Sequence, residues 1–104
     1  MSTELSIFKI EYDEQFFRSH GYKITLTQIG NTIYYSDFLE AIIEASRQKY
    51  WHLESECGFM GELLGKDIKA LIEYKKLADK EPKNAELINN NLIDDDYYRI
   101  NVSY

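Results

Sequence analysis

YYRINVSY, residues 97–104, is the stretch that decides the fold class of this chain. Tyr98, Ile100, Val102 and Tyr104 alternate with their neighbours, which is the two-residue period of a strand with one buried face. A strand needs a partner, and one this regular predicts pairing with a strand from the N-terminal third of the chain. The two ends of the chain are therefore expected to meet in one sheet.

Three strands are predicted in that N-terminal third. Residues 5–12 alternate apolar and polar except for a slip at 7–8, which favours a bulge or a strand covered on both faces. Residues 22–29 alternate and are rich in β-branched and aromatic side chains. The Gly-Asn pair at 30–31 then predicts a two-residue hairpin connection to a short strand over 32–35.

Helices are predicted in the middle of the chain. Apolar side chains recur at helical spacing after an N-cap at Ser36 or Asp37, and again from Gly61 up to Pro82. Pro82 ends the second helix, because the residue before a proline avoids the α region, and can open a third, shorter one. A short helical turn is also expected over 14–20.

Strands at both ends with helices between them predict an α+β fold. We expect a small antiparallel or mixed sheet of about four strands, one at the C-terminus, with two to three helices packed on one face. A length of 104 residues supports one hydrophobic core, so residues 1–104 are expected to form a single domain. The composition, 44% hydrophobic and 29% charged, is typical of a globular chain.

Charge and aromatic content favour some classes of function over others. Twelve Lys and Arg against 18 Asp and Glu leave a net charge of −6, which disfavours direct binding to nucleic-acid phosphates. An acidic surface favours a basic protein partner, although it also serves solubility alone. Nine Tyr and five Phe suit a protein interface as well as the edge of a core.

The cellular compartment is predicted from the cysteine content, the N-terminal residues and the length of the apolar stretches. Cys57 is the only cysteine, so neither an intramolecular disulfide nor a cysteine-based zinc site is expected. The first residues have neither the basic region nor the apolar run of a secretory signal, and no apolar stretch approaches the roughly 20 residues that span a bilayer. We therefore expect a cytoplasmic protein without a membrane partner.

A phosphate-binding loop is the first chemical motif to test. Gly61 and Gly65 precede Lys66, but the P-loop needs four residues between its glycines and a Ser or Thr after the lysine. Here three residues separate the glycines, and Asp67 follows the lysine. The match fails, and the two glycines instead favour close approach of a helix to its neighbour.

His52, Glu56 and Cys57 form the densest group of candidate metal ligands and nucleophiles. On a helix, His52 and Glu56 would lie one turn apart, but a catalytic zinc needs three protein ligands. Adjacent acids disfavour a thiolate, so Cys57 is expected to be a partly buried, inert thiol. We assign no catalytic residue, no metal ligand and no cofactor.

The acidic run Asp94-Asp95-Asp96 has three interpretations. It can be a turn between helix and strand, where Asp is locally favoured. Together with Tyr97 and Tyr98 it can be an acidic and aromatic patch for a basic partner. It can also be a metal site, although the alternating ligands of a calcium loop are missing. The same acidic and aromatic character recurs at Glu11, Tyr12, Asp13 and Glu14.

Three classes of function follow from these features. The first is a small acidic inhibitor of a basic, nucleic-acid-acting protein; it resembles immunity proteins, antitoxins and phage-encoded inhibitors in physical character, not in motif. Its partner-binding residues would be Asp94, Asp95, Asp96, Tyr97, Tyr98, Glu11, Asp13 and Glu14. The second is an adaptor or chaperone subunit that forms a homodimer or adds a partner strand, with 97–104 as the exposed edge. The third is a small enzyme whose site residues converge only in space.

Overall fold

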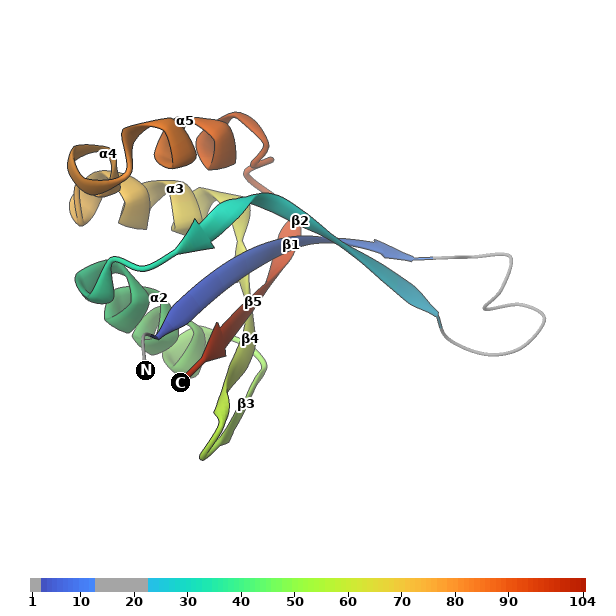
Figure 1. Ribbon diagram of the computed structural model, residues 1–104. Helices are drawn as coiled ribbons and strands as arrows, with labels where there is room; N and C mark the ends of the chain where they lie inside the picture. Colours follow the sequence, from blue (N-terminus) through green and yellow to red (C-terminus); the bar gives the residue numbers. More distant parts are fainter. Residues whose placement is uncertain (1–2, 13–22) are drawn as a thin grey trace.

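One antiparallel sheet organises the residues that the structure describes, 3–12 and 23–104. In this computed structural model the strand order is β2–β1–β5–β4–β3 (Figure 1). The strands are β1 (Glu4–Tyr12), β2 (Ile24–Ile33), β3 (His52–Ser55), β4 (Gly58–Leu64) and β5 (Tyr97–Ser103). The α+β class is confirmed, with five strands in place of the expected four.

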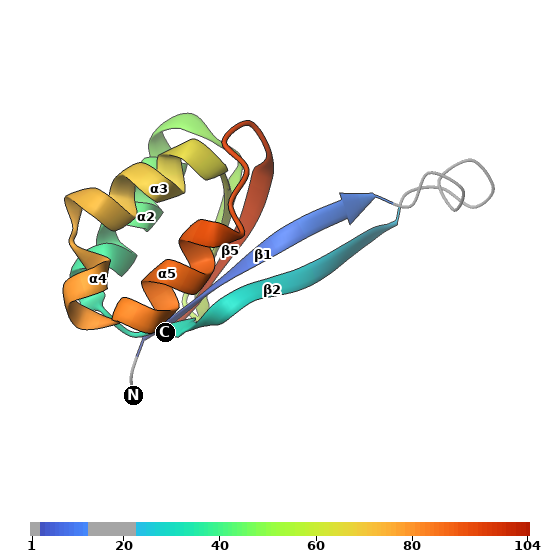
Figure 2. The ribbon, with the colours of Figure 1, turned by 90° about the horizontal axis from the view of Figure 1, so that it is seen from above.

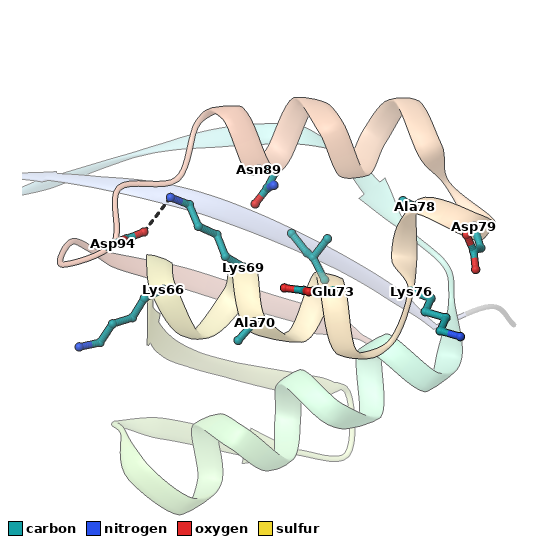
Figure 3. Close-up of a pocket in the computed structure, with 10 residues that line it drawn as sticks. Lys66, Lys69, Ala70, Glu73, Lys76, Ala78, Asp79, Asn89 and Asp94 are labelled. Atoms are coloured by element: carbon teal, nitrogen blue, oxygen red, sulfur yellow. Dashed lines mark hydrogen bonds and ion pairs between the residues drawn. The ribbon is translucent and has the colours of Figure 1, made fainter.

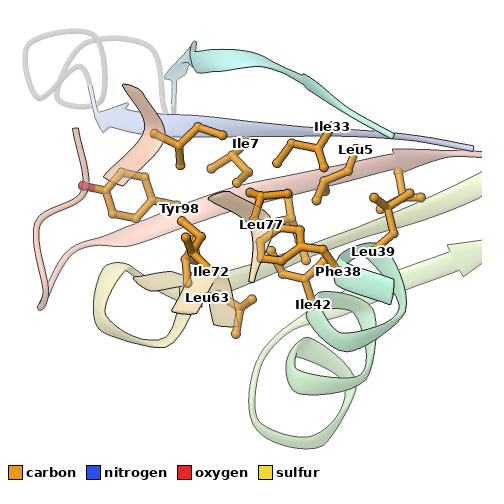
Figure 4. Packing of buried hydrophobic residues seen from close by; sticks show 14 of the residues in the cluster. Leu5, Ile7, Ile33, Phe38, Leu39, Ile42, Leu63, Ile72, Leu77 and Tyr98 are labelled. Atoms are coloured by element: carbon orange, nitrogen blue, oxygen red, sulfur yellow. The ribbon is translucent and has the colours of Figure 1, made fainter. Parts of the chain in front are cut away.

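β5 lies at the centre of the sheet. It pairs with β1, where Ile7 lies opposite Ile100, and with β4, where Gly61 lies opposite the same residue. The predicted pairing of the two chain ends is therefore confirmed. The expectation that this strand offers an exposed edge is wrong, because both of its edges are already bonded. Tyr98 and Val102 are buried on the side that faces the helices, and Tyr98 is seen among the core side chains in Figure 4.

The helices cover one face of the sheet (Figure 1). They are α2 (Ser36–Lys49), α3 (Gly65–Tyr74), α4 (Leu77–Lys80) and α5 (Pro82–Asn90). α5 begins at Pro82 as predicted, because the fixed φ of proline suits the first helical position. The N-cap of α2 is Tyr35, one residue before the predicted Ser36 and two before the alternative Asp37. Within the described residues, no helix combines the length and the apolar character needed to cross a membrane.

The predicted hairpin at Gly30-Asn31 is wrong, since β2 runs through both residues. Leu5 lies opposite Ile33, and Ile7 lies opposite Ile29. Two residue steps along β1 therefore correspond to four along β2, so β2 holds the extra residues of a bulge. Gly30 has a φ of 66°, which suits a tight turn and a bulge equally well.

The second helix begins later than predicted. Residues 58–64 form β4, with Phe59 and Leu63 buried against the core, and α3 begins only at Gly65. Gly61 occupies a core-facing position between them, where an added Cβ would collide with Ser46 Oγ of α2. The close approach expected of Gly61 is therefore confirmed, but it is an approach of strand β4 to helix α2.

The outer parts of β1 and β2, residues 8–12 and 24–28, form an arm that extends beyond the helices (Figure 2) and is two-stranded after Lys9, the last residue of β1 that pairs with β5. Most side chains of the arm are exposed. The arm contributes to an elongated outline of 46 × 32 × 24 Å. The helical turn expected over 14–20 lies outside the described residues.

Candidate functional site

The acidic run lies in the turn between α5 and β5, as the first of its three interpretations predicted. The backbone of this turn caps the start of α3. Gly65 N donates to the Asp96 carbonyl at 2.9 Å, and Lys66 N donates to the Asp94 carbonyl at 3.1 Å. These bonds satisfy amides that have no partner within the helix, so the turn holds a defined position.

The three carboxylates of the turn are not equivalent. Lys69 Nζ donates to Asp94 at 2.7 Å, which makes Asp94 part of the connection to α3 (Figure 3). Lys66 Nζ is 4.0 Å from Asp95, whose side chain is 90% exposed. An exposed pair at that distance contributes little free energy, so Asp95 remains accessible to a partner. Asp96 is exposed as well.

The two tyrosines after the turn point to opposite faces of the sheet. Tyr97 is 51% exposed, whereas Tyr98 is 1% exposed and belongs to the core. The hydroxyl of Tyr98 accepts a hydrogen bond from Ile93 N at 2.8 Å and donates one to the Asn91 carbonyl at 3.3 Å. Tyr98 is therefore removed from the predicted binding residues, because its ring and its hydroxyl are both occupied inside the protein.

The sheet brings the second acidic and aromatic segment next to the first. Lys9 lies opposite Tyr98 in the pairing of β1 with β5, so the end of β1 passes beside the turn. A hollow of about 300 Å³ lies between the two segments and is lined by Lys9, Ile10, Tyr12, Asp95, Asp96, Tyr97 and Tyr98. Tyr12, Asp95, Asp96 and Tyr97 are all exposed and are named here the acidic-aromatic patch.

Of the other predicted residues on this segment, Glu11 pairs with Lys9 at 3.5 Å. Asp13 and Glu14 lie outside the described residues.

Tyr97 is held from the side by its neighbours. The rings of Tyr50 and Tyr97 meet edge to face with centroids 6.0 Å apart. Tyr50 in turn donates to Asp67 Oδ2 at 2.5 Å, and this hydrogen bond, reinforced by desolvation, raises the pKa of Tyr50 to about 12. A ring supported in this way loses little conformational entropy when a partner covers it.

The sheet face away from the helices, called the open sheet face below, carries a feature that the sequence interpretation missed. Arg99 lies between Phe8 on β1 and Glu62 on β4, and its guanidinium is 5.0 Å from the Trp51 ring. One guanidinium nitrogen, Nη2, donates to Glu62 at 3.3 Å, while Nε has no partner among the described residues. The apolar side chains at positions in register with this face are Phe8, Ile10, Ile24, Leu26, Leu53, Met60 and Leu64.

A groove of about 880 Å³ lies elsewhere, along α3, α4 and α5 (Figure 3). Charged side chains of both signs line it, among them Lys66, Lys69, Glu73 and Asp79. No histidine, cysteine or hydroxyl side chain is among its lining residues.

The remaining candidates for chemistry are dispersed. His52 lies on β3 instead of a helix, and its ring stacks on Phe59 with centroids 5.8 Å apart. Cys57 is exposed, which corrects the expectation of a partly buried thiol. Across residues 3–12 and 23–104, no three His, Cys, Asp or Glu side chains are grouped so that they could hold a metal ion.

Comparisons with known proteins add nothing to these observations. No protein-family model matches the chain, and searches of curated proteins and of solved structures found no match.

Proposed function

We propose that this chain is a small acidic protein-binding inhibitor, which blocks a basic, nucleic-acid-acting protein by occlusion. The observation that carries the proposal is the convergence of two distant segments in the acidic-aromatic patch. Tyr12 comes from β1, and Asp95, Asp96 and Tyr97 come from the turn before β5, yet all four surround one hollow.

The chemistry of the patch matches a cationic groove. A groove that binds nucleic acid presents Lys and Arg to phosphates, and exposed carboxylates can occupy the same positions. Asp95 and Asp96 supply that charge, and the net charge of −6 accelerates encounter with a basic partner. Tyr12 and Tyr97 supply large, rigid contact area beside the carboxylates.

The open sheet face next to the patch favours a protein as the partner. Its exposed apolar side chains include Leu26 at one edge of the sheet and Leu53 at the other, with Trp51 beside β3, and exposed aromatic and apolar side chains are typical of protein interfaces. Arg99 on this face is paired with Glu62, which makes the described part of the face a poor surface for nucleic-acid phosphates.

Affinity capture from a lysate tests the proposal, with the wild type and the variant Asp95→Asn/Asp96→Asn compared at low and high salt. We expect the wild type to retain one basic protein stoichiometrically at low salt and less of it at high salt. The variant should associate about tenfold more slowly and lose most of this salt dependence, since it removes two charges from the patch.

The matched control is Asp79→Asn/Glu86→Gln, which removes the same charge from exposed positions on α4 and α5. It should behave like the wild type. Equal weakening by both variants would show that net charge alone drives capture, and would overturn the patch as the binding site.

A further inference from the structure

β2 is an edge strand with an unusual composition. Its sequence over Ile24–Ile33 is ITLTQIGNTI, with no charged residue and no proline. Natural edge strands usually carry Lys, Pro or inward charges, which discourage pairing with other chains. The opposite edge, β3, has four residues, and its Glu54 is ion-paired with Arg47. β2 is thus the longer and the less protected edge of the sheet.

Only the inner part of this edge is covered by the helices. Asn84 of α5 bonds to both backbone groups of Asn31, and Glu81 accepts a hydrogen bond from Tyr34 N. Residues 24–28 lie farther out on the arm (Figure 2), where Thr27 and Gln28 line a hollow together with Leu87 and Asn90 of α5. No described strand lies on their outer side. The backbone groups that face outward there can pair with another strand.

We propose that residues 24–28 pair with the same residues of a second copy of this chain, antiparallel about a two-fold axis at Leu26. In that register Leu26 faces Leu26 of the second copy, and Thr25 faces its Thr27. Ile24 faces Gln28 in the same way. The segment is therefore complementary to itself, and β-branched or apolar side chains make up four of its five residues.

Charge favours a second copy over a segment of a basic protein. A basic segment would find no carboxylate on β2 to pair with, whereas two copies bring no like charges together within the paired strands. The antiparallel arrangement also places the helices of the two copies at opposite ends of the paired β2 segments. Ile29 of one copy then lies roughly 20 Å along the ribbon from Ile29 of the other. That separation exceeds a Debye length of about 8 Å, so the net charges of −6 repel weakly.

Sedimentation equilibrium of the purified chain tests this pairing, with Thr25→Lys/Thr27→Lys as the disrupting variant. Both threonines are exposed and lie opposite Glu11 and Lys9, on the side away from the open sheet face. The wild type should be dimeric at tens of micromolar. The variant sets introduced lysines opposite each other across the axis, so its dissociation constant should rise at least tenfold.

Two control variants separate the charge pairing from damage to the arm. Thr25→Lys/Thr27→Glu sets opposite charges across the axis and should dimerise as well as the wild type. Thr27→Lys alone keeps the repulsion against Lys9 but faces a threonine of the second copy, and should also remain dimeric. A monomeric wild type, a dimeric double-lysine variant or a monomeric Lys/Glu variant would each overturn the proposal. The measurement needs no partner, so it is independent of the inhibitor proposal.

Discussion

Asn84 is the residue that fixes the bulge of β2 to the helical layer. Its Oδ1 accepts a hydrogen bond from Asn31 N at 2.8 Å, and its Nδ2 donates to the Asn31 carbonyl at 2.9 Å. Asn84 is buried, so Asn84→Ala leaves two backbone groups without these partners. We expect the free energy of unfolding to fall by about 1–3 kcal/mol in urea denaturation. Asn89→Ala changes an exposed residue of the same helix and should cost less than about 0.5 kcal/mol. Equal losses in the two variants would contradict this role.

Tyr50 makes stability depend on pH in the alkaline range. The hydrogen bond to Asp67 raises the pKa of Tyr50 to about 12, while an unfolded tyrosine ionises near 10. The folded state therefore favours the neutral phenol, and this contribution is complete below pH 10 and lost as the pH rises through about 12. The difference in free energy of unfolding between the wild type and Tyr50→Phe should shrink over that window.

Urea denaturation at several pH values measures this difference, and Asp67→Asn is the informative control. An asparagine carries no charge and can donate its amide N–H to a phenolate oxygen, so it no longer favours the neutral phenol, and the pKa of Tyr50 should return toward its ordinary value. The difference between Asp67→Asn and the double variant with Tyr50→Phe should then decline at lower pH. A difference that stays constant from pH 8 to about 12 would show that Tyr50 does not ionise differently in the folded state.

At the scale of the elements, local pattern predicts α2, α5 and β5 well. An apolar stripe of helical period defines α2, Pro82 starts α5, and strict alternation defines β5. Each of these signals lies within the element itself, so no distant contact is needed to read it.

β4 and the bulge of β2 could not be predicted in the same way. Leu63, Leu64 and Ile68 continue at helical spacing, whereas the alternation of β4 is hidden because Gly61 occupies a core position. Gly30 is compatible with a hairpin and with a bulge, and the choice depends on Asn84, 53 residues away from Asn31. Contacts at such separation leave no local pattern.

The candidate site was predictable in its parts but not in its assembly. Each acidic and aromatic segment is visible in the sequence, yet their meeting depends on β1 pairing with β5 at Lys9 and Tyr98. Alternation along β5 places Tyr98 with Ile100 on the buried face, so its removal from the surface follows from the strand pattern. The apolar character of the open sheet face was not predicted. Phe8 and Ile10 lie on the side of β1 opposite to its buried residues, Leu5 and Ile7, where strand alternation favours polar side chains.

At the scale of the whole molecule, the two proposed surfaces meet at the arm, because Tyr12 of the acidic-aromatic patch lies opposite Ile24 of the proposed pairing segment. The acidic-aromatic patch lies where β1 meets β5, whereas the proposed pairing uses the far edge of β2. A dimer formed through that edge leaves Asp95, Asp96 and Tyr97 of each copy outside the paired strands, and so presents two sets of these residues to partners. Two linked sites can raise the apparent affinity for a partner with repeated basic surface, without any new contact.

The outline of the dimer distinguishes pairing at the arm from any compact association. One copy is 46 Å long, and five paired residues of about 3.4 Å each overlap in the shared ribbon. Small-angle X-ray scattering of the wild-type dimer should therefore give a maximum dimension of roughly 75 Å or more. Two copies packed side by side through the open sheet face would stay near the length of one copy. Thr25→Lys/Thr27→Lys should return the monomer dimension, and Thr25→Lys/Thr27→Glu should keep the extended one. A compact dimer would place the interface on the open face, where Arg99 and Trp51 would then be covered.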